Sequence, residues 1–150
     1  ALATGAMAAF ETTLQQTIAV AFFVPAIVYL ADAIGTQTEA IAVRRLSLTR
    51  AGIVHLLAGE LRTGMLLGAI LGLTAFVPVW LAFGDARLGA AVATAIFAAG
   101  TMAAGLGLIL PWWIARSGRD PAFGSGPLAT VIQDILSILV YLGVVRAFGL

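Results

Sequence analysis

The sequence contains no cysteine, no lysine and only one histidine, and 10% of its 150 residues are charged. Without cysteine, the chain has no disulfide, no thiolate metal site and no thiol nucleophile. Its single histidine, His55, cannot build a metal site that needs several imidazoles. The formal net charge of +1 provides no strongly basic or acidic surface, so nucleic acid is not an expected partner.

Apolar residues are what the sequence has in excess. They make up 61% of the chain, and the mean hydropathy is +1.07. Soluble domains are about 45–50% apolar and about 25% charged, so a water-soluble fold of this length could not bury so much apolar surface. The expected fold class is an all-α membrane bundle, because a helix satisfies its own backbone hydrogen bonds in lipid.

Long apolar runs divide the chain into transmembrane spans. Four full spans are expected, at about residues 18–43, 63–83, 88–115 and 122–145. As a helix, the apolar segment at residues 1–10 would cover only about half of the bilayer core, so it indicates a partial first span and a longer parent protein. The chain is thus expected to be one transmembrane domain over residues 1–150, with about five helices.

Arginines gather in two of the three predicted connections between the full spans. Residues 44–62 hold four arginines and residues 116–121 hold two, whereas Arg87 in the turn at 84–87 is offset by Asp85. The positive-inside rule then places the first two connections in the cytoplasm and the third outside. The sequence predicts a multi-pass protein of the plasma membrane, which in a bacterium is the inner membrane.

Small residues in two of the spans indicate close helix packing. Gly64, Gly68 and Gly72 recur at every fourth position, which places them on one face of a helix. The span at 88–115 is rich in alanine and glycine. Such residues let membrane helices approach each other closely, so packing is the expected role of these positions.

Two of the apolar spans also carry rows of polar side chains. The row in the last span consists of Thr130, Asp134, Ser137 and Tyr141. The row in the span at 18–43 includes Tyr29, Asp32, Thr36 and Glu39. Intervals of three and four residues place each row on one helical face, and Asp32 and Asp134 lie near the middle of their spans. Two carboxylates at one depth can face a shared cavity.

A carboxylate at the centre of a bilayer needs an explanation, because inserting it costs about 2.5–3.5 kcal/mol. One interpretation is structural, with each aspartate protonated or hydrogen-bonded in a packed interface. The other is a cation site. Its donors would be oxygen atoms, which suit Mg²⁺, Ca²⁺ or Mn²⁺, and a sparse site suits Mg²⁺, which keeps much of its water. Since one Asp134 per chain supplies little charge, a twofold dimer is expected to bring two together.

Two segments resemble the membrane domain of the MgtE family of magnesium transporters and channels. Residues 21–48, AFFVPAIVYLADAIGTQTEAIAVRRLSL, resemble the family's second helix, and residues 120–143, DPAFGSGPLATVIQDILSILVYLG, resemble its fifth. The resemblance implies a homodimer with five helices per chain and a pore on the twofold axis. It implies that Asp134 and the backbone carbonyl of Thr130 hold hydrated Mg²⁺ through water, and that Asp120 binds regulatory Mg²⁺ together with a cytosolic domain.

The segment around Asp32 departs from the family pattern. Where the family has an asparagine in a glycine-rich segment, this chain reads Ala31, Asp32, Ala33 and Ile34 before Gly35. The extra carboxylate would favour a tighter, less hydrated site, so Asp32 is expected to be a further metal ligand. The expected pore lining consists of Tyr29, Gly35, Thr36, Gln37, Gly126, Gln133, Ser137 and Tyr141.

Magnesium transport through a dimeric pore is therefore the predicted function, with Mg²⁺ as the transported ion and paired aspartates as its ligands. Three alternatives stay open: a carrier for another divalent cation such as Mn²⁺, Co²⁺ or Ca²⁺, an exporter coupled to Na⁺ or H⁺ through Asp32, and a non-transporting scaffold subunit in which Asp134 joins helices. An enzyme is not expected, because the sequence shows no nucleophile–base pair. The expected partners are a second copy, the lipid bilayer and a cytosolic regulatory domain outside residues 1–150.

Overall fold

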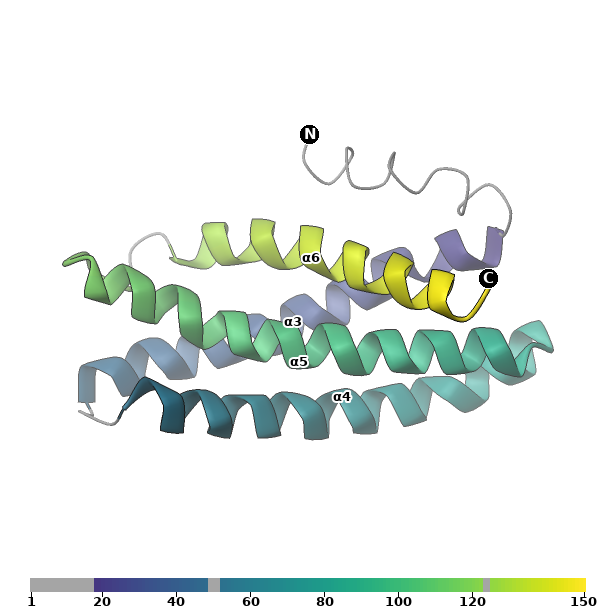
Figure 1. Cartoon of the computed structure of the whole chain (residues 1–150), viewed down its shortest axis with the longest axis horizontal. Coiled ribbons are helices and arrows are strands. Elements are labelled where there is room, and N and C mark those ends of the chain that lie inside the picture. Colours follow the sequence, from purple (N-terminus) through teal and green to yellow (C-terminus); the bar gives the residue numbers. More distant parts are fainter. Residues whose placement is uncertain (1–17, 49–51, 123–124) are drawn as a thin grey trace.

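The computed structural model describes residues 18–48, 52–122 and 125–150. In these ranges the chain forms four long α-helices and no β-strand: α3 (Ile18–Leu48), α4 (Ile53–Phe83), α5 (Ala86–Arg116) and α6 (Ser125–Ala147) (Figure 1). Each helix is long and apolar enough to cross a membrane. The predicted all-α membrane fold is thereby confirmed. The partial span predicted at residues 1–10 lies outside the described residues.

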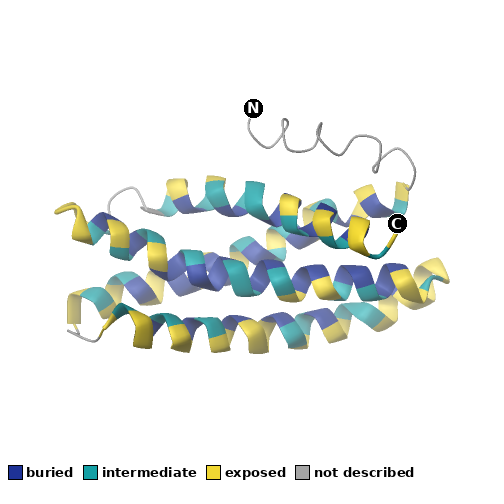
Figure 2. Cartoon of the chain, viewed as in Figure 1, coloured by how far each residue is buried: buried dark blue, intermediate teal, exposed yellow. Residues whose placement is uncertain are grey.

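Helix α5 lies at the centre of the described bundle. It packs along α4, α3 and α6, and α3 also packs along α6, whereas α3 and α4 make few contacts. Figure 1 shows the helices running along the long axis of the molecule. Buried positions follow nearly the whole of α5, while exposed positions follow the outer side of α4 (Figure 2). Helix α5 thus takes part in two interfaces, one with α4 and the other with α3 and α6.

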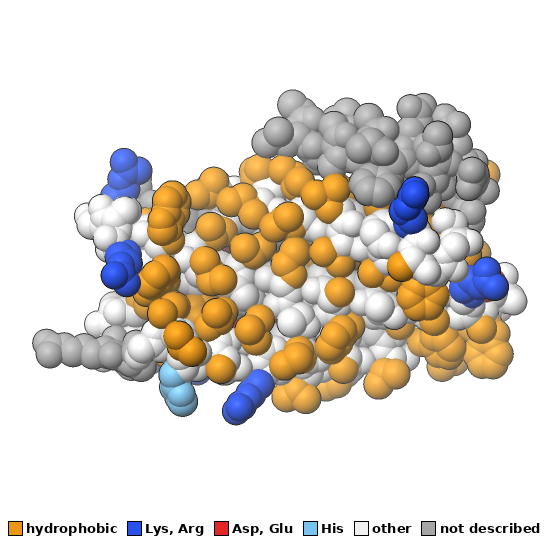
Figure 3. All heavy atoms as spheres, viewed as in Figure 1, with side chains coloured by type: hydrophobic (Ala, Val, Ile, Leu, Met, Phe, Trp, Pro, Cys, Tyr) orange, Lys and Arg blue, Asp and Glu red, His pale blue; other side chains and the backbone are white. Residues whose placement is uncertain are grey.

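The surface of the bundle has the distribution expected of a membrane protein. Large apolar side chains along α4, such as Leu66, Ile70 and Leu73, are more than half exposed. On the face shown in Figure 3, hydrophobic side chains cover the middle of the molecule, and arginines lie mostly toward its two ends. An apolar band between charged ends fits a hydrocarbon layer between two headgroup layers.

Glycines bring α4 and α5 into close contact. A Cβ atom on Gly68 would lie 2.9 Å from the Cα of Phe97, and one on Gly72 would lie 2.6 Å from the carbonyl oxygen of Ala93. Gly64 is buried on the same face of α4. A side chain does not fit at such distances unless the backbone moves, so the packing role predicted for these glycines is confirmed.

The turn between α4 and α5 is made by Gly84 and Asp85. Gly84 has a φ of 67°, in the left-handed region that favours glycine. The Asp85 carboxylate then caps α5 by accepting hydrogen bonds from the backbone N–H of Arg87 at 2.8 Å and of Leu88 at 3.2 Å. The chain therefore reverses within a few residues, which makes α4 and α5 antiparallel neighbours.

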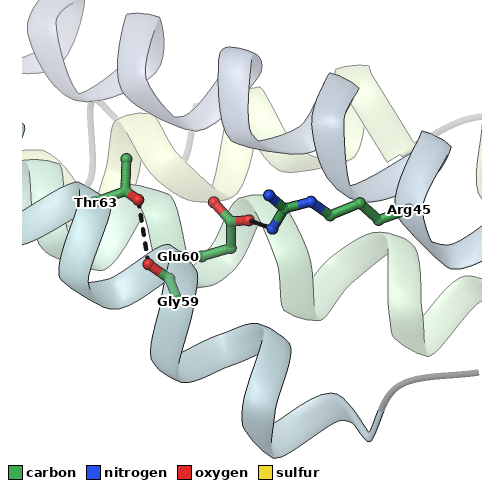
Figure 4. A network of polar contacts seen from close by, with 4 residues as sticks. All are labelled: Arg45, Gly59, Glu60 and Thr63. Atoms are coloured by element: carbon green, nitrogen blue, oxygen red, sulfur yellow. Dashed lines mark hydrogen bonds and ion pairs between the residues drawn. The ribbon is translucent and has the colours of Figure 1, made fainter. Parts of the chain in front are cut away.

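The connection predicted at residues 44–62 is wrong, because both flanking helices continue into it. Helix α3 runs to Leu48, and α4 begins at Ile53. Hydropathy marks where the lipid ends, whereas a helix continues as long as its backbone hydrogen bonds are made. The extended ends are also joined, since Nη1 of Arg45 donates to Oε1 of Glu60 at 2.7 Å (Figure 4).

Candidate functional site

The two predicted polar rows lie on helices that pack against each other in opposite directions. Near one end of the interface, the hydroxyl of Tyr141 on α6 donates to the carbonyl oxygen of Val20 on α3 at 2.7 Å. Further along, the amide of Gln133 lies so close to Gly35 that no Cβ atom would fit there. Helices α3 and α6 are therefore antiparallel neighbours, and Asp32 lies opposite the middle of α6.

Asp32 and Asp134 come together at this interface. Both are half-buried, one on each helix, and Asp134 directly follows Gln133, whose amide packs on Gly35, one turn from Asp32. Within the ranges that the structure describes, no group of three or more histidine, cysteine or acidic side chains is placed to hold a metal ion. A pair of carboxylates suits a cation that keeps its water better than a bare one. The role of both aspartates as metal ligands stays a prediction.

Three predicted pore-lining residues of α3 face outward: Tyr29 and Thr36, which belong to the polar row, and Gln37, which follows Thr36. Tyr29 is 76% exposed, and Thr36 and Gln37 are exposed as well. The hydroxyl of Thr36 donates to the backbone carbonyl oxygen of Asp32 at 2.8 Å, so it is directed along its own helix. These three residues lie on the surface of the subunit, which is where a pore between two copies would need them.

Four residues predicted to line the pore are buried, Gly35 on α3 and three residues on α6. Gln133 is 1% exposed, and Ser137 and Tyr141 are fully buried. Thr130 and Asp134, from the same predicted row, are half-buried. The row therefore passes from the subunit surface into the interior along α6. The pore-lining role of its buried members stays a prediction, while the bond of Tyr141 to α3 shows that it joins two helices.

A pocket of about 410 Å³ opens between the C-terminal half of α3 and the start of α6. Its lining consists of Thr36, Glu39, Ala40, Val43, Ala122, Gly126 and Pro127. Two of the predicted pore residues, Thr36 and Gly126, thus share one pocket. Glu39 is only 8% exposed, and it brings a carboxylate to the same pocket.

Asp120 lies beside this pocket, in the turn that leads into α6. It is exposed, and its Oδ1 accepts a hydrogen bond from the backbone N–H of Ala122 at 2.9 Å. The carboxylate therefore shapes the turn locally, as aspartates commonly do. Its predicted part in binding regulatory Mg²⁺ stays a prediction.

Comparison with known proteins gives the family. The sequence model of a family described as MgtE, divalent cation transporter, matches residues 24–144. The chain belongs to the MgtE family. The matched residues include all of α4 and α5 and most of α3 and α6, so the shared region is the helical bundle that carries both aspartates. The family is described as one of transporters, which is not a class of enzymes.

Individual members of the MgtE family agree with this assignment. The magnesium transporter MgtE of Bacillus subtilis is 37% identical over 145 residues, which cover 93% of this chain and 32% of that protein. The protein of the same name from Enterococcus faecalis is 32% identical over 142 residues, covering 93% and 31%. That of Thermus thermophilus is 28% identical over 146 residues, covering 91% and 31%. The chain therefore spans about a third of the length of these relatives.

The sequence does not predict that Gly107 lies next to Gly35 in this MgtE bundle. A Cβ atom on Gly107 of α5 would lie 2.7 Å from the carbonyl oxygen of Gly35. Gly35 is thus held between α5 on one side and the amide of Gln133 on the other. The glycine content of the span at 88–115 signals close packing, but it does not tell which glycine faces α3.

Proposed function

We propose that this chain forms the membrane pathway of a magnesium transporter of the plasma membrane, and that two copies enclose it. The observation that carries the proposal is the position of Asp32 on α3 and Asp134 on α6 beside the contact between Gly35 and Gln133, in a bundle of the MgtE family. Relatives named magnesium transporters match this chain over 91–93% of its length. Two carboxylates at mid-depth between apolar helices suit a divalent cation in its water shell.

The second copy is proposed to cover the polar face of α3. Tyr29, Thr36 and Gln37 are exposed on a helix that is apolar enough to cross a membrane. Lipid would leave the Tyr29 hydroxyl and the Gln37 amide without hydrogen-bond partners, which costs free energy. Packing this face against its twofold copy would surround a hydrated path with polar groups and bring two Asp134 carboxylates to it.

A cytosolic regulatory domain is proposed as a further partner, at the end of the bundle that carries Asp120. The positive-inside rule assigns this end to the cytoplasm, because it also carries Arg44, Arg45 and Arg116. The exposed carboxylate of Asp120 and the pocket next to it would bind regulatory Mg²⁺ together with that domain.

Reconstituted liposomes test the transport proposal directly. Liposomes that hold the purified chain and a fluorescent Mg²⁺ indicator are expected to take up Mg²⁺ down its gradient. Asp134→Ala is expected to abolish this uptake and to leave the protein folded in size exclusion, because it removes the insertion cost of a central charge. Selective uptake by a folded Asp134→Ala protein would overturn the proposal.

A matched control is offered by Thr74, a polar residue far from the proposed path. It is exposed on α4, and its hydroxyl donates to the carbonyl oxygen of Ile70 in the same helix at 2.7 Å. Thr74→Val is therefore expected to keep wild-type uptake. A loss of uptake comparable to that of Asp134→Ala would show that the assay reports general damage to the bundle.

The same liposomes separate the alternative functions. Competition by Mn²⁺, Co²⁺ or Ca²⁺ identifies the preferred divalent ion. An imposed Na⁺ or H⁺ gradient that drives Mg²⁺ against its own gradient would indicate a coupled carrier. If a folded protein admits none of these ions, the scaffold function replaces transport.

A further inference from the structure

The interface between α3 and α6 buries polar atoms that have no hydrogen-bond partner among the described residues. They are Oδ1 of Asp32, both amide atoms of Gln133 and Oγ of Ser137. Gln133 is 1% exposed, and Ser137 is fully buried. Because each unsatisfied polar atom costs free energy inside a membrane, this group of atoms requires partners.

These atoms lie on facing turns of the two helices. Gln133 and Ser137 are one turn apart on α6, and Asp32 and Gly35 are one turn apart on α3. The amide of Gln133 packs directly on Gly35. Asp134 is the residue that follows Gln133 along α6. The buried polar atoms therefore belong to one place in the fold, beside the aspartate pair.

The donors and acceptors in this group match one another. The Ser137 hydroxyl can donate, the Gln133 amide has one acceptor oxygen and an NH2 group with two N–H donors, and Oδ1 of an ionised Asp32 only accepts. None of these atoms is hydrogen-bonded to another in the structure. Side-chain rotations that let Ser137 donate to Oε1 of Gln133, and Nε2 of Gln133 donate to Oδ1 of Asp32, would give each of the four atoms a partner. A bare cation at this place would leave the amide nitrogen without a partner.

We propose that Gln133, held by Ser137, is a specificity-determining residue that anchors Oδ1 of Asp32 and leaves the other carboxylate oxygen for the ion. The proposal rests on the transport function proposed above. Ca²⁺ gathers more oxygen ligands than Mg²⁺ and often binds both oxygens of one carboxylate, whereas Mg²⁺ prefers single oxygens and keeps its water. Restricting Asp32 to one oxygen therefore disfavours Ca²⁺ more than Mg²⁺.

The first test compares Ca²⁺ and Mg²⁺ uptake by the full chain in liposomes. Gln133→Met keeps the length of the side chain but removes its donor and its acceptor. The rate of Ca²⁺ uptake relative to Mg²⁺ uptake is expected to rise about three- to tenfold, which corresponds to the loss of one hydrogen bond. Ser137→Ala is expected to shift the ratio in the same direction by less, and Thr74→Val is expected to leave it unchanged.

A double variant separates anchoring from packing. In an Asp32→Asn protein there is no carboxylate to anchor, so adding Gln133→Met is expected to leave the Ca²⁺ to Mg²⁺ ratio where Asp32→Asn alone puts it. A residue that only packs would shift the ratio equally in both backgrounds, or would slow both ions without changing their ratio. Either of these results would overturn the proposal.

A spectroscopic measurement tests the anchor without transport. Infrared difference spectra on adding Mg²⁺ or Ca²⁺ report the carboxylate stretches of Asp32, which are assigned by their loss in Asp32→Asn. The splitting of these bands is expected to indicate one-oxygen binding of both ions in the wild type and two-oxygen binding of Ca²⁺ in Gln133→Met. Identical Asp32 bands in both proteins would overturn the proposal. If the wild type shows the expected Asp32 bands but takes up no Mg²⁺ in liposomes, only the proposed transport function is overturned.

Discussion

The interface between α4 and α5 and the interface between α3 and α6 differ in what they bury. The mean hydropathy of the apolar stretches is similar in both pairs, 2.2 for α4 and 1.9 for α5 against 2.1 for both α3 and α6. Yet α4 buries glycines against the backbone of α5, whereas α6 buries Gln133, Ser137 and Tyr141. Along Gly64, Gly68 and Gly72 the first interface coheres through close backbone contact, and its one buried carboxylate among the described residues, Glu60, is paired with Arg45. Gln133 and Ser137 of the second interface have no hydrogen-bond partner among the described residues, so cohesion does not explain their polar groups.

The largest effect is expected from a substitution in the glycine interface. Gly68→Leu would drive a side chain into the backbone of Phe97, which the Cβ alone would already approach to 2.9 Å. We expect the free energy of unfolding to fall by at least about 3 kcal/mol, at the top of the range for overpacked cores. Denaturant titration in detergent, followed by circular dichroism, measures the change.

The control for this variant is Gly59→Leu in the same helix. A Cβ atom on Gly59 would meet no atom within 4 Å, so a side chain there projects into open space. We expect the midpoint of unfolding to stay near that of the wild type. If both leucines destabilise the protein equally, the α4–α5 interface is not the close contact that these distances indicate.

An intermediate effect is expected at the ion pair that joins the ends of α3 and α4. The Arg45 side chain is 49% exposed, but that of Glu60 is only 6% exposed. Arg45→Met would leave the buried Glu60 carboxylate without its ion-pair partner, and we expect it to lower the free energy of unfolding by about 1–3 kcal/mol. Glu60→Gln leaves an exposed guanidinium that water solvates, so its cost should stay below about 1 kcal/mol.

The order of these two costs is the informative result. It is measured by denaturing both variants and the double variant under the same conditions, which also gives the coupling energy of the pair. A larger cost for Glu60→Gln than for Arg45→Met would mean that water reaches the Glu60 carboxylate. In that case the ion pair would contribute little to joining the extended ends of α3 and α4.

How far the sequence predicts this fold depends on the physical signal at each place. Apolar run length locates all four described helices, because it measures compatibility with lipid. The spacing of Gly64, Gly68 and Gly72 predicts a packed face, because a four-residue repeat is local to one helix. The helix ends at residues 44–62 escape prediction, because backbone hydrogen bonding continues where apolarity stops.

The site was predictable only in part, for a different reason. Depth along a helix follows from residue count, so the mid-span positions of Asp32 and Asp134 could be read from the sequence. Inward or outward direction depends on which neighbour lies alongside each turn. Thr130 and Asp134 are half-buried while Tyr141 is fully buried, although all three share one predicted row. No spacing within α6 contains that information.

Tyr141 offers a small expected effect and the sharpest comparison between packing and permeation. Its hydroxyl donates to the carbonyl oxygen of Val20 at 2.7 Å, and both residues are fully buried. Tyr141→Phe removes this bond but keeps the ring, so the free energy of unfolding should fall by about 1 kcal/mol. The carbonyl oxygen of Val20 has two lone pairs and can still accept a backbone hydrogen bond within α3. Losing the Tyr141 hydroxyl therefore does not leave this oxygen without a partner, which limits the loss of stability.

The same variant decides whether the buried end of the α6 row borders the ion path. If Tyr141 only joins α6 to α3, Tyr141→Phe should lower the unfolding midpoint and leave the ratio of Mg²⁺ to Ca²⁺ uptake at its wild-type value. A pore-lining hydroxyl would behave in the opposite way, because its loss would change ion hydration in the path. A changed ratio with an unchanged midpoint would therefore place Tyr141 with Asp134, and the polar interface would line the pore along its whole length.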